Sequence, residues 1–212
     1  MVRKPKRREL NRRAPSARRQ VILEAGLAAF SVDGFAATKM DDVAAKAGVA
    51  KGTVYLYFKD KQDLFEQIVR EAVAPVIARI EGMALLPGAP TELVLKSLFE
   101  IFRIEVLGTH RKDALRLVLT EGPKFPSIAE FYHREVVSRG LRLIRELLQR
   151  AKAKGELSTD ALADFPQLVF APLIMAVIWD GLFADIEPLD VEKMFDAHRR
   201  ALLVGPGHGK SS

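Results

Sequence analysis

The sequence contains no cysteine among its 212 residues, which excludes disulfide bonds and thiolate chemistry. This absence favours a reducing compartment. No apolar run approaches the roughly 20 residues that a membrane-spanning helix needs. No apolar signal segment follows the basic N-terminus either. We therefore expect a cytoplasmic protein with no membrane partner.

Signatures of catalysis are also missing. The sequence has no GxSxG, P-loop, GxGxxG or HExxH motif. None of the histidines is paired with a carboxylate at the i, i+4 spacing of a metal site; they are His110, His133, His198 and His208. We expect no enzymatic activity, no cofactor and no metal.

Positive charge is concentrated at the N-terminus. Residues 1–20 hold nine Lys or Arg against the single Glu9, whereas the whole chain has a net charge of +6. Pro5 and Pro15 oppose helix formation in this stretch. We expect residues 1–15 to be a disordered basic arm that is attracted to polyphosphate, with a merely solubilising tail as the alternative.

The stretch 39–58 carries the pattern of two short helices. Met40, Val43, Ala44 and Ala47 form one apolar face, and Gly48 is suited to end that helix in a left-handed conformation. Thr38 and Asp41 resemble a capping box at its start. A second helix from about residue 50 directs Val54 and Phe58 inward. Two short helices joined by a glycine-containing turn are a helix-turn-helix unit.

The second helix leaves polar and small residues for a DNA groove. Lysines and hydroxyls can contact phosphates or base edges, glycine permits close backbone approach, and an exposed leucine suits a thymine methyl group. Two lysines follow directly and are expected to contact phosphates. The predicted DNA contacts are Thr38, Lys39, Lys51, Gly52, Thr53, Tyr55, Leu56, Tyr57, Lys59 and Lys61. The alternative is a plain helical hairpin in an all-α core.

The remainder of the chain is helical in pattern, with no strand periodicity. A helix is expected from residue 16 or 17 to 32, and a long one from 61 to about 83 links the two parts of the chain. The loop 86–90 contains Pro87, Gly88 and Pro90. Further helices are expected at 91–107, 112–120, 128–154, 160–184 and 190–203, before an unstructured tail at 205–212.

The run Gly52-Thr53-Val54-Tyr55-x-Tyr57-Phe58-x-x-Lys61 resembles the helix-turn-helix of the tetracycline-repressor (TetR) family of bacterial transcription regulators. The resemblance is strong over residues 18–64. It implies a DNA-binding domain at 16–60, with the helix-turn-helix at 39–58, and a helical ligand-binding and dimerisation domain at 61–204. It also implies minor-groove contacts by the arm, for which Arg12, Arg13, Arg18 and Arg19 are the candidates.

Dimerisation is expected through residues 160–203. Helix-turn-helix proteins usually bind DNA as two-fold dimers, and the helix at 160–184 is apolar nearly all round. We expect this helix to be buried on all sides, in a core or between subunits; burial within one subunit is the alternative. In the resembling family, the last two long helices form a four-helix dimer bundle.

The resemblance further implies a small-molecule cavity in the second domain. Aromatic, methionine and basic side chains are the candidate lining, although each of them taken singly suits an ordinary core or a solvated surface. The candidates are Phe99, Phe102, Arg103, His110, Arg116, Phe131, Phe170, Met175 and Trp179.

The sequence therefore predicts an all-α, dimeric transcriptional repressor. We expect its partner to be a double-stranded, palindromic DNA operator, from which a small hydrophobic or amphipathic effector releases it. Two alternatives remain open. One is an activator of the same family, and the other is an all-helical protein-interaction adaptor with an incidental basic tail.

Overall fold

The computed structural model describes residues 15–84 and 88–204. These residues form helices, and the only β pairing among them is an isolated bridge between Leu157 and Leu203. The predicted all-α fold is confirmed. The predicted arm, apart from Pro15, and the predicted tail at 205–212 lie outside the described residues.

The contacts divide the chain into two compact units. Unit 1 is Met1–Ala72 with Asp113–Tyr132, and unit 2 is Val73–Lys112 with His133–Ser212. The chain passes from one unit to the other within α5 (Lys61–Ala84), within α7 (Arg111–Glu121), and where α8 (Pro126–Tyr132) continues into the π-helical turn η2 (His133–Val137). Residues 113–132 thus group with the N-terminal helices, whereas the predicted second domain at 61–204 includes them.

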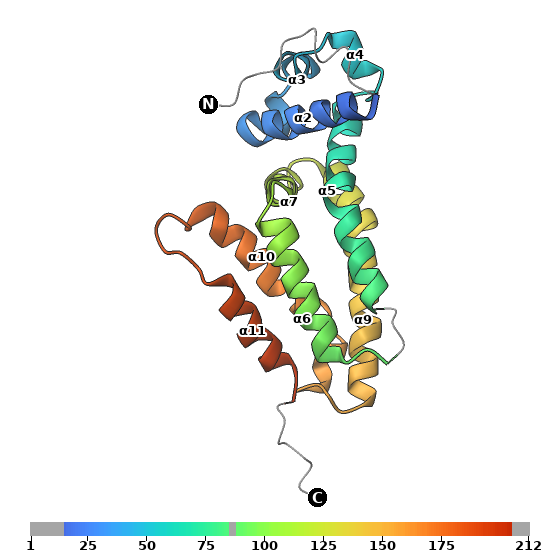
Figure 1. Cartoon of the computed structure of the whole chain (residues 1–212), viewed down its shortest axis with the longest axis vertical. Helices are drawn as coiled ribbons and strands as arrows, with labels where there is room; N and C mark the ends of the chain where they lie inside the picture. Colours follow the sequence, from blue (N-terminus) through green and yellow to red (C-terminus); the bar gives the residue numbers. More distant parts are fainter. Residues whose placement is uncertain (1–14, 85–87, 205–212) are drawn as a thin grey trace, which may run out of the picture. The chain divides into compact units, whose positions relative to one another are not determined.

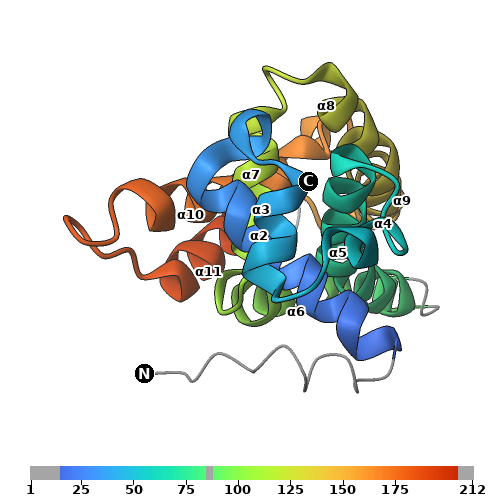
Figure 2. The same ribbon diagram turned by 90° about the horizontal axis from the view of Figure 1, so that it is seen from above.

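Unit 1 begins with α2 (Pro15–Ala37), α3 (Met40–Ala47) and the short α4 (Lys51–Tyr55). Helices α2 and α3 lie against one another in both views (Figures 1 and 2). Helical geometry in α2 is interrupted at Gly34, with φ 75° and ψ 165°, two residues after the end predicted from the sequence. The interruption turns the chain toward α3.

The core of unit 1 is rich in phenylalanine. Phe35 meets the ring of Phe30 at 5.5 Å between centroids, that of Phe65 at 5.5 Å, and that of Phe125 at 5.0 Å. Phe30 and Phe65 are fully buried. Tilted and edge-on contacts of this kind are favourable for aromatic rings. The cluster joins α2 and α5 to the segment that follows α7.

By length and composition, α2 is the one helix in the described ranges that could cross a membrane. Core helices of water-soluble domains pass the same test. In α2 the side chains of Ile22, Ala29 and Phe30 are buried against the rest of unit 1. Packing within the unit therefore accounts for these apolar residues.

Unit 2 contains α6 (Thr91–Ile101), the π-helical turn η1 (Phe102–Leu107), α9 (Ser138–Ala153), the 3₁₀ turn η3 (Asp160–Ala163), α10 (Gln167–Leu182) and α11 (Val191–Leu202). Helix α6 contacts α9 and α11, and α10 contacts α11 and η1. The chain turns back between α10 and α11, so these two helices form a pair (Figure 1).

Three expected helices are not continuous α-helices. The helix expected at 160–184 is divided into η3 and α10, because Pro166 has no N–H and disfavours helical geometry at Phe165. The helix expected at 91–107 changes to π geometry at Phe102. The helix expected at 128–154 begins earlier, at Pro126, and contains the π turn η2. Local π turns have no clear signature in apolar periodicity, so the sequence analysis missed them.

The alternative that the helix at 160–184 is buried wholly within one subunit is wrong for the described residues. On α10, Leu168 is 44% exposed, Met175 is 47% exposed and Leu182 is 65% exposed. These residues recur every seven positions and therefore share one side of the helix. Among the described residues, the neighbours of α10 cover the opposite side, which carries Val169, Leu173 and Val177.

Candidate nucleic-acid interface

The corner between α3 and α4 is closed by backbone hydrogen bonds. Gly48 adopts φ 69°, and the N–H of Val49 donates to the carbonyl of Ala44 at 3.0 Å. The N–H of Thr53 donates to Ala50 at 2.9 Å and begins α4. Glycine accepts this left-handed conformation without steric cost. The corner therefore has the predicted helix-turn-helix geometry, although α4 is only five residues long.

Buried apolar residues anchor both helices of the corner to the rest of unit 1. Val43, Ala44 and Ala47 of α3 are buried, as are Val54 of α4 and Phe58 just after it. This is the inward face that the sequence predicts. Its burial fixes which side of α4 points outward.

The outward side of α4 is open to solvent. Leu56 is 82% exposed and Tyr55 is 45% exposed, and Lys51 and Gly52 are exposed beside them. A methyl group added at Gly52 would meet nothing within 4 Å. An exposed leucine next to a glycine, a lysine and a tyrosine suits a major groove, where a thymine methyl group can cover the leucine. Thr53 and Tyr57 are half-buried at the margin of this surface.

The lysines around this surface differ in whether their side chains are paired with a carboxylate. Lys51 forms an ion pair with Asp41 of α3 at 2.8 Å, and the hydrogen bond to that carboxylate raises the pKa of Lys51. Lys39 and Lys59 are exposed, and it is their backbone N–H groups that donate to Asp42 and Asp63. Asp42, not the predicted Asp41, therefore caps the start of α3.

Thr38 is not part of the exposed surface. Its side chain is among the buried polar groups at 2% exposure, and its hydroxyl donates to the carbonyl of Gly34 at 2.8 Å. The hydrogen bond satisfies a carbonyl at the interruption of α2. The structure therefore gives Thr38 an internal role, which sequence spacing alone did not distinguish from an exposed one.

Lys61 is directed at the protein backbone. Its ammonium donates to the carbonyls of Phe35 at 2.6 Å and Ala36 at 2.9 Å, and lies 4.7 Å from the centre of the Phe35 ring. Partial burial lowers the pKa of Lys61. A cation that satisfies the last carbonyls of a helix stabilises that end. In this arrangement Lys61 ties the start of α5 to the end of α2.

The candidate arginines of the arm are only partly described. Arg12 and Arg13 lie outside the described residues, and Arg18 is half-buried in α2. Arg19 pairs with Glu71, donates to Gln67 at 3.1 Å and lies 5.6 Å from the centre of the Phe58 ring. Arg19 therefore links α2 with α5 and lies over Phe58, the buried residue that follows α4.

The segment 121–125 lies beside the end of α2, a contact that the sequence did not predict. Besides the contact between Phe125 and Phe35, the buried carboxylate of Glu121 lies beside Gly34, with Oε1 3.5 Å from where a Cβ would stand. Glu121 also pairs with Lys124 at 3.1 Å. A buried glutamate is unusual, but no single-sequence signal pairs it with a glycine almost ninety positions away.

The predicted ligand-pocket residues do not form one group in the structure. Phe99 and Phe102 come together, since both contact the ring of Phe195 on α11, at centroid distances of 5.2 and 6.4 Å. Phe170 has a different neighbour, because its ring would lie 3.3 Å from a Cβ at Gly140. The Trp179 indole donates to the carbonyl of Glu187 at 2.6 Å.

The other predicted lining residues are at the surface or in unit 1. Met175 and His110 are exposed, and Arg103 pairs with Glu100 at 2.6 Å. Arg116 and Phe131 belong to unit 1. Phe99 and Phe102, which meet around Phe195, are therefore the predicted lining residues that the structure brings together.

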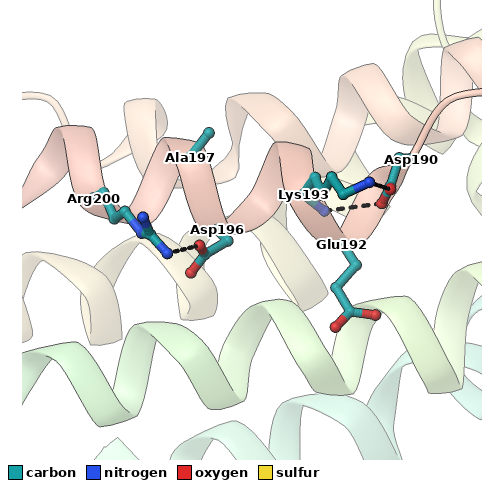
Figure 3. Close-up of a pocket in the computed structure, with 6 residues that line it drawn as sticks. All are labelled: Asp190, Glu192, Lys193, Asp196, Ala197 and Arg200. Atoms are coloured by element: carbon teal, nitrogen blue, oxygen red, sulfur yellow. Dashed lines mark hydrogen bonds and ion pairs between the residues drawn. The ribbon is translucent and has the colours of Figure 1, made fainter.

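A groove on unit 2 lies elsewhere, along α11 (Figure 3). Its lining contains none of the predicted pocket residues and consists of Asp190, Glu192, Lys193, Asp196, Ala197 and Arg200. Ion pairs join Lys193 to Asp190 at 2.8 Å and Arg200 to Asp196 at 2.6 Å. These charges are paired along the helix itself, and a groove lined mostly by charged residues does not match the apolar cavity expected from the sequence.

Two family models match the chain. The model described as bacterial regulatory proteins of the tetR family matches residues 22–68, and the model described as a tetracyclin repressor-like C-terminal domain matches residues 95–197. The first match includes α3, α4 and the exposed surface described above.

Curated relatives are transcriptional regulators by name. The transcriptional regulator AcuR of Cereibacter sphaeroides is 30% identical over 159 residues, covering 73% of this chain and 72% of that protein. AcrR of Shigella flexneri is 31% identical over 101 residues, and YhgD of Bacillus subtilis is 38% identical over 95 residues. For these last two, the matched region spans about half of the relative, 47% and 48%.

Solved structures share the fold at low identity. NalD, described as the secondary repressor of the MexAB-OprM multidrug efflux pump in Pseudomonas aeruginosa, has a TM-score of 0.73 and 20% identity, with coverage of 90% of this chain and 98% of NalD. The fatty acid degradation regulator FadR of Bacillus halodurans has a TM-score of 0.69 and 24% identity, with coverage of 93% of this chain and 100% of FadR.

Proposed function

Because the chain belongs to the tetR family of bacterial regulatory proteins, we propose that it is a cytoplasmic repressor that binds a DNA operator as a dimer. The family is one of transcriptional regulators and not of enzymes. The observation that carries the proposal is the open outward side of α4, on which Leu56 is 82% exposed. A leucine this exposed on an otherwise anchored helix is accounted for by a partner that covers it.

DNA recognition is assigned to α4 and its flanks. Thr53 and Leu56 face base edges, whereas Lys51, Tyr57 and Lys59 contact phosphates. Thr53→Ala or Leu56→Ala should change the preference among operators, by about 1–3 kcal/mol for each base edge that is no longer read. Tyr57→Phe should weaken binding to all sequences alike. The measurement is a competition series with operator variants.

Dimer formation is assigned to α10 and α11. The exposed apolar side of α10 gives a second copy a surface to bury, and a two-fold dimer places its recognition helices about 34 Å apart, one turn of DNA. A palindromic operator follows from that symmetry.

The effector is proposed to be a small hydrophobic or amphipathic molecule. Two structural relatives are named for fatty acid degradation and for multidrug efflux. In this chain the aromatic group of Phe99, Phe102 and Phe195 is the proposed contact for an apolar ligand. Release requires that the ligand bind the DNA-free arrangement more tightly than the DNA-bound one.

The test is fluorescence anisotropy with duplex DNA from upstream of the gene that encodes this protein, in excess random competitor. Tight binding that survives the competitor supports the repressor assignment and provides an assay for effectors. Binding that the competitor removes contradicts it for that DNA, and a chain without residues 1–14 then shows whether the arm alone caused the binding. Reporter expression that falls when the gene is deleted would indicate an activator.

A further inference from the structure

Helix α9 has one buried side and one strongly basic side. Its buried residues are Leu143, Ile144, Leu147, Leu148 and Ala151. This burial fixes the orientation of the helix in unit 2. On the outer side, Arg142, Arg145, Gln149 and Lys152 are exposed at spacings of three, four and three residues. These four residues, here called the α9 stripe, extend over about 15 Å at 1.5 Å per residue.

The stripe lies in a chain with strongly separated charges. Residues 134–154 contain seven Lys or Arg and two Glu, whereas residues 155–192 contain eight Asp or Glu and no Lys or Arg. A surface that merely kept the protein in solution would be expected to mix both signs. The separation concentrates positive potential on α9.

The arginines of the stripe are not used inside the protein. In the described part of the chain the side chains of Arg142 and Arg145 take part in no ion pair or hydrogen bond. Lys152 has only a long contact of 3.7 Å with Asp160. By contrast, Arg139 is on another side of α9 and pairs with Glu81 at 2.7 Å. The stripe is therefore free to bind an anion.

We propose that the α9 stripe binds the phosphate backbone of duplex DNA, as a second DNA-contacting surface apart from α4. Guanidinium groups form paired hydrogen bonds with phosphate oxygens, and the amide of Gln149 can donate to another. A length of about 15 Å spans roughly four nucleotides of one strand at about 3.4 Å each. The contact carries no base specificity, because no base edge is involved.

Other anionic partners fit the stripe less well. A protein partner usually adds an aromatic or aliphatic anchor at the centre of its interface, and a membrane surface favours large apolar residues beside the basic ones. The other exposed residues between and beside the cations are Ser138, Glu146, Gln149, Arg150 and Ala153, and none of them is a large apolar residue. An interface made of charge and hydrogen bonds alone suits a polyphosphate, for which counterion release supplies the affinity.

The test uses the full chain with a duplex of random sequence, titrated by anisotropy over a range of salt concentrations. We compare R142Q/R145Q with R79Q/K96Q, a control that removes two positive charges from unit 2 outside the stripe. The stripe variant should reduce the slope of log K against log salt by up to about 1.8, or about 0.9 for each phosphate that is no longer neutralised. The control should keep the wild-type slope, and circular dichroism checks that both variants fold.

Failure of this inference is separable from failure of the proposed function. A parallel variant, Lys59→Ala, reports on the α4 surface. If it lowers the slope while R142Q/R145Q does not, the inference is overturned and the repressor assignment stands. If only R142Q/R145Q lowers the slope, the inference stands and the assignment of α4 fails. Equal slopes for the stripe variant and R79Q/K96Q also overturn the inference.

Two sources of phosphate are distinguished by two arms of the experiment. Longer flanks on one duplex should strengthen binding if the stripe contacts the same DNA as α4. If the stripe contacts a second DNA molecule, protein that is bound to DNA on beads should capture a labelled duplex from solution. R142Q/R145Q should lose whichever of the two effects the wild-type protein shows. Loss of binding to phosphatidylserine vesicles, with unchanged DNA binding, would assign the stripe to a membrane and contradict the proposal.

Discussion

At the scale of single residues, the structure separates basic and hydroxyl side chains that face solvent from those that hold the fold. Lys59 and Lys61 are two positions apart, yet Lys59 is exposed whereas Lys61 donates to two backbone carbonyls. Thr38 and Thr53 differ in the same way, since Thr38 is buried and Thr53 lies at the edge of the exposed surface. Residue type alone does not separate these roles.

The two lysines should therefore respond differently to substitution. Lys61→Ala removes a charged donor from the carbonyls of Phe35 and Ala36, and should lower the free energy of unfolding by about 1–2 kcal/mol. Lys59→Ala should leave that free energy unchanged and lower the salt slope of DNA binding by about one unit. Urea denaturation and anisotropy titrations measure the two quantities. If Lys61→Ala lowers the salt slope at wild-type stability, Lys61 is a phosphate contact instead.

Two glycines should also respond differently to substitution by alanine. Gly34 has φ 75° and ψ 165°, a region open almost only to glycine, so Gly34→Ala should destabilise the protein by about 1–3 kcal/mol. Gly52 lies in α4 with nothing within 4 Å of an added methyl group. Gly52→Ala should raise stability by about 0.5–1 kcal/mol while weakening DNA binding, because the added methyl group keeps the backbone further from the DNA. Thermal unfolding followed by circular dichroism checks both, and equal effects on stability would refute the distinction.

At the scale of elements, the end of α2 and helix α5 pack against a segment that is far away in sequence. The segment 113–132 belongs to unit 1. Within it, Phe125 contacts Phe35 and Glu121 lies beside Gly34. Arg70 of α5 lies 5.1 Å from the centre of the Phe131 ring. The end of α2, which leads into the DNA-binding corner, is thus supported by residues almost ninety positions further along the chain.

Phe125 should accordingly affect the N-terminal helices. Phe125→Ala removes a half-buried ring from the aromatic cluster, so it should cost about 1–3 kcal/mol, less than a fully buried phenylalanine. Hydrogen exchange in α2 and α3 should accelerate with it. Phe165→Ala is the control, because Phe165 is 58% exposed and its removal should change neither stability nor exchange. Unchanged protection of α2 in Phe125→Ala would show that the segment does not support the corner.

At the scale of the whole molecule, the exposed apolar side of α10 is the surface on which we expect a partner to bind. The side chains of Leu168, Met175 and Leu182 form one stripe on this helix, and Ile178 adds a fourth exposed apolar residue. Contiguous apolar surface of this kind is uncommon on a monomer. A second copy of the chain, placed by a two-fold axis, would cover it in the way that a palindromic operator requires.

A charge on the exposed apolar side of α10 should weaken the proposed dimer. Leu182→Glu places a carboxylate where apolar burial is expected, and should weaken self-association by about 30-fold or more, which corresponds to about 2 kcal/mol. Leu93→Glu is the control, because Leu93 is 56% exposed on α6, outside the proposed interface. Light scattering after gel filtration measures both masses. A dimeric Leu182→Glu variant, or a monomeric Leu93→Glu variant, would show that the interface is not on this side of α10.

Short-range chemistry made much of this protein predictable from its sequence. Apolar periodicity predicted the helices, Gly48 marked the end of α3, and the run from Gly52 to Lys61 identified the helix-turn-helix and the family. Burial of Val54 and Phe58 followed from their spacing. All of these depend on residues within about one or two helical turns, where backbone geometry alone fixes which side chains share a face.

Only the tertiary structure decided which side chains meet across long separations. It paired Lys61 with the end of α2, buried Thr38, brought Phe125 to Phe35, and placed Phe195 beside the predicted Phe99. It also left one side of α10 uncovered, although its sequence is apolar nearly all round. Such contacts depend on how whole helices pack, and no local pattern in a single sequence encodes that packing.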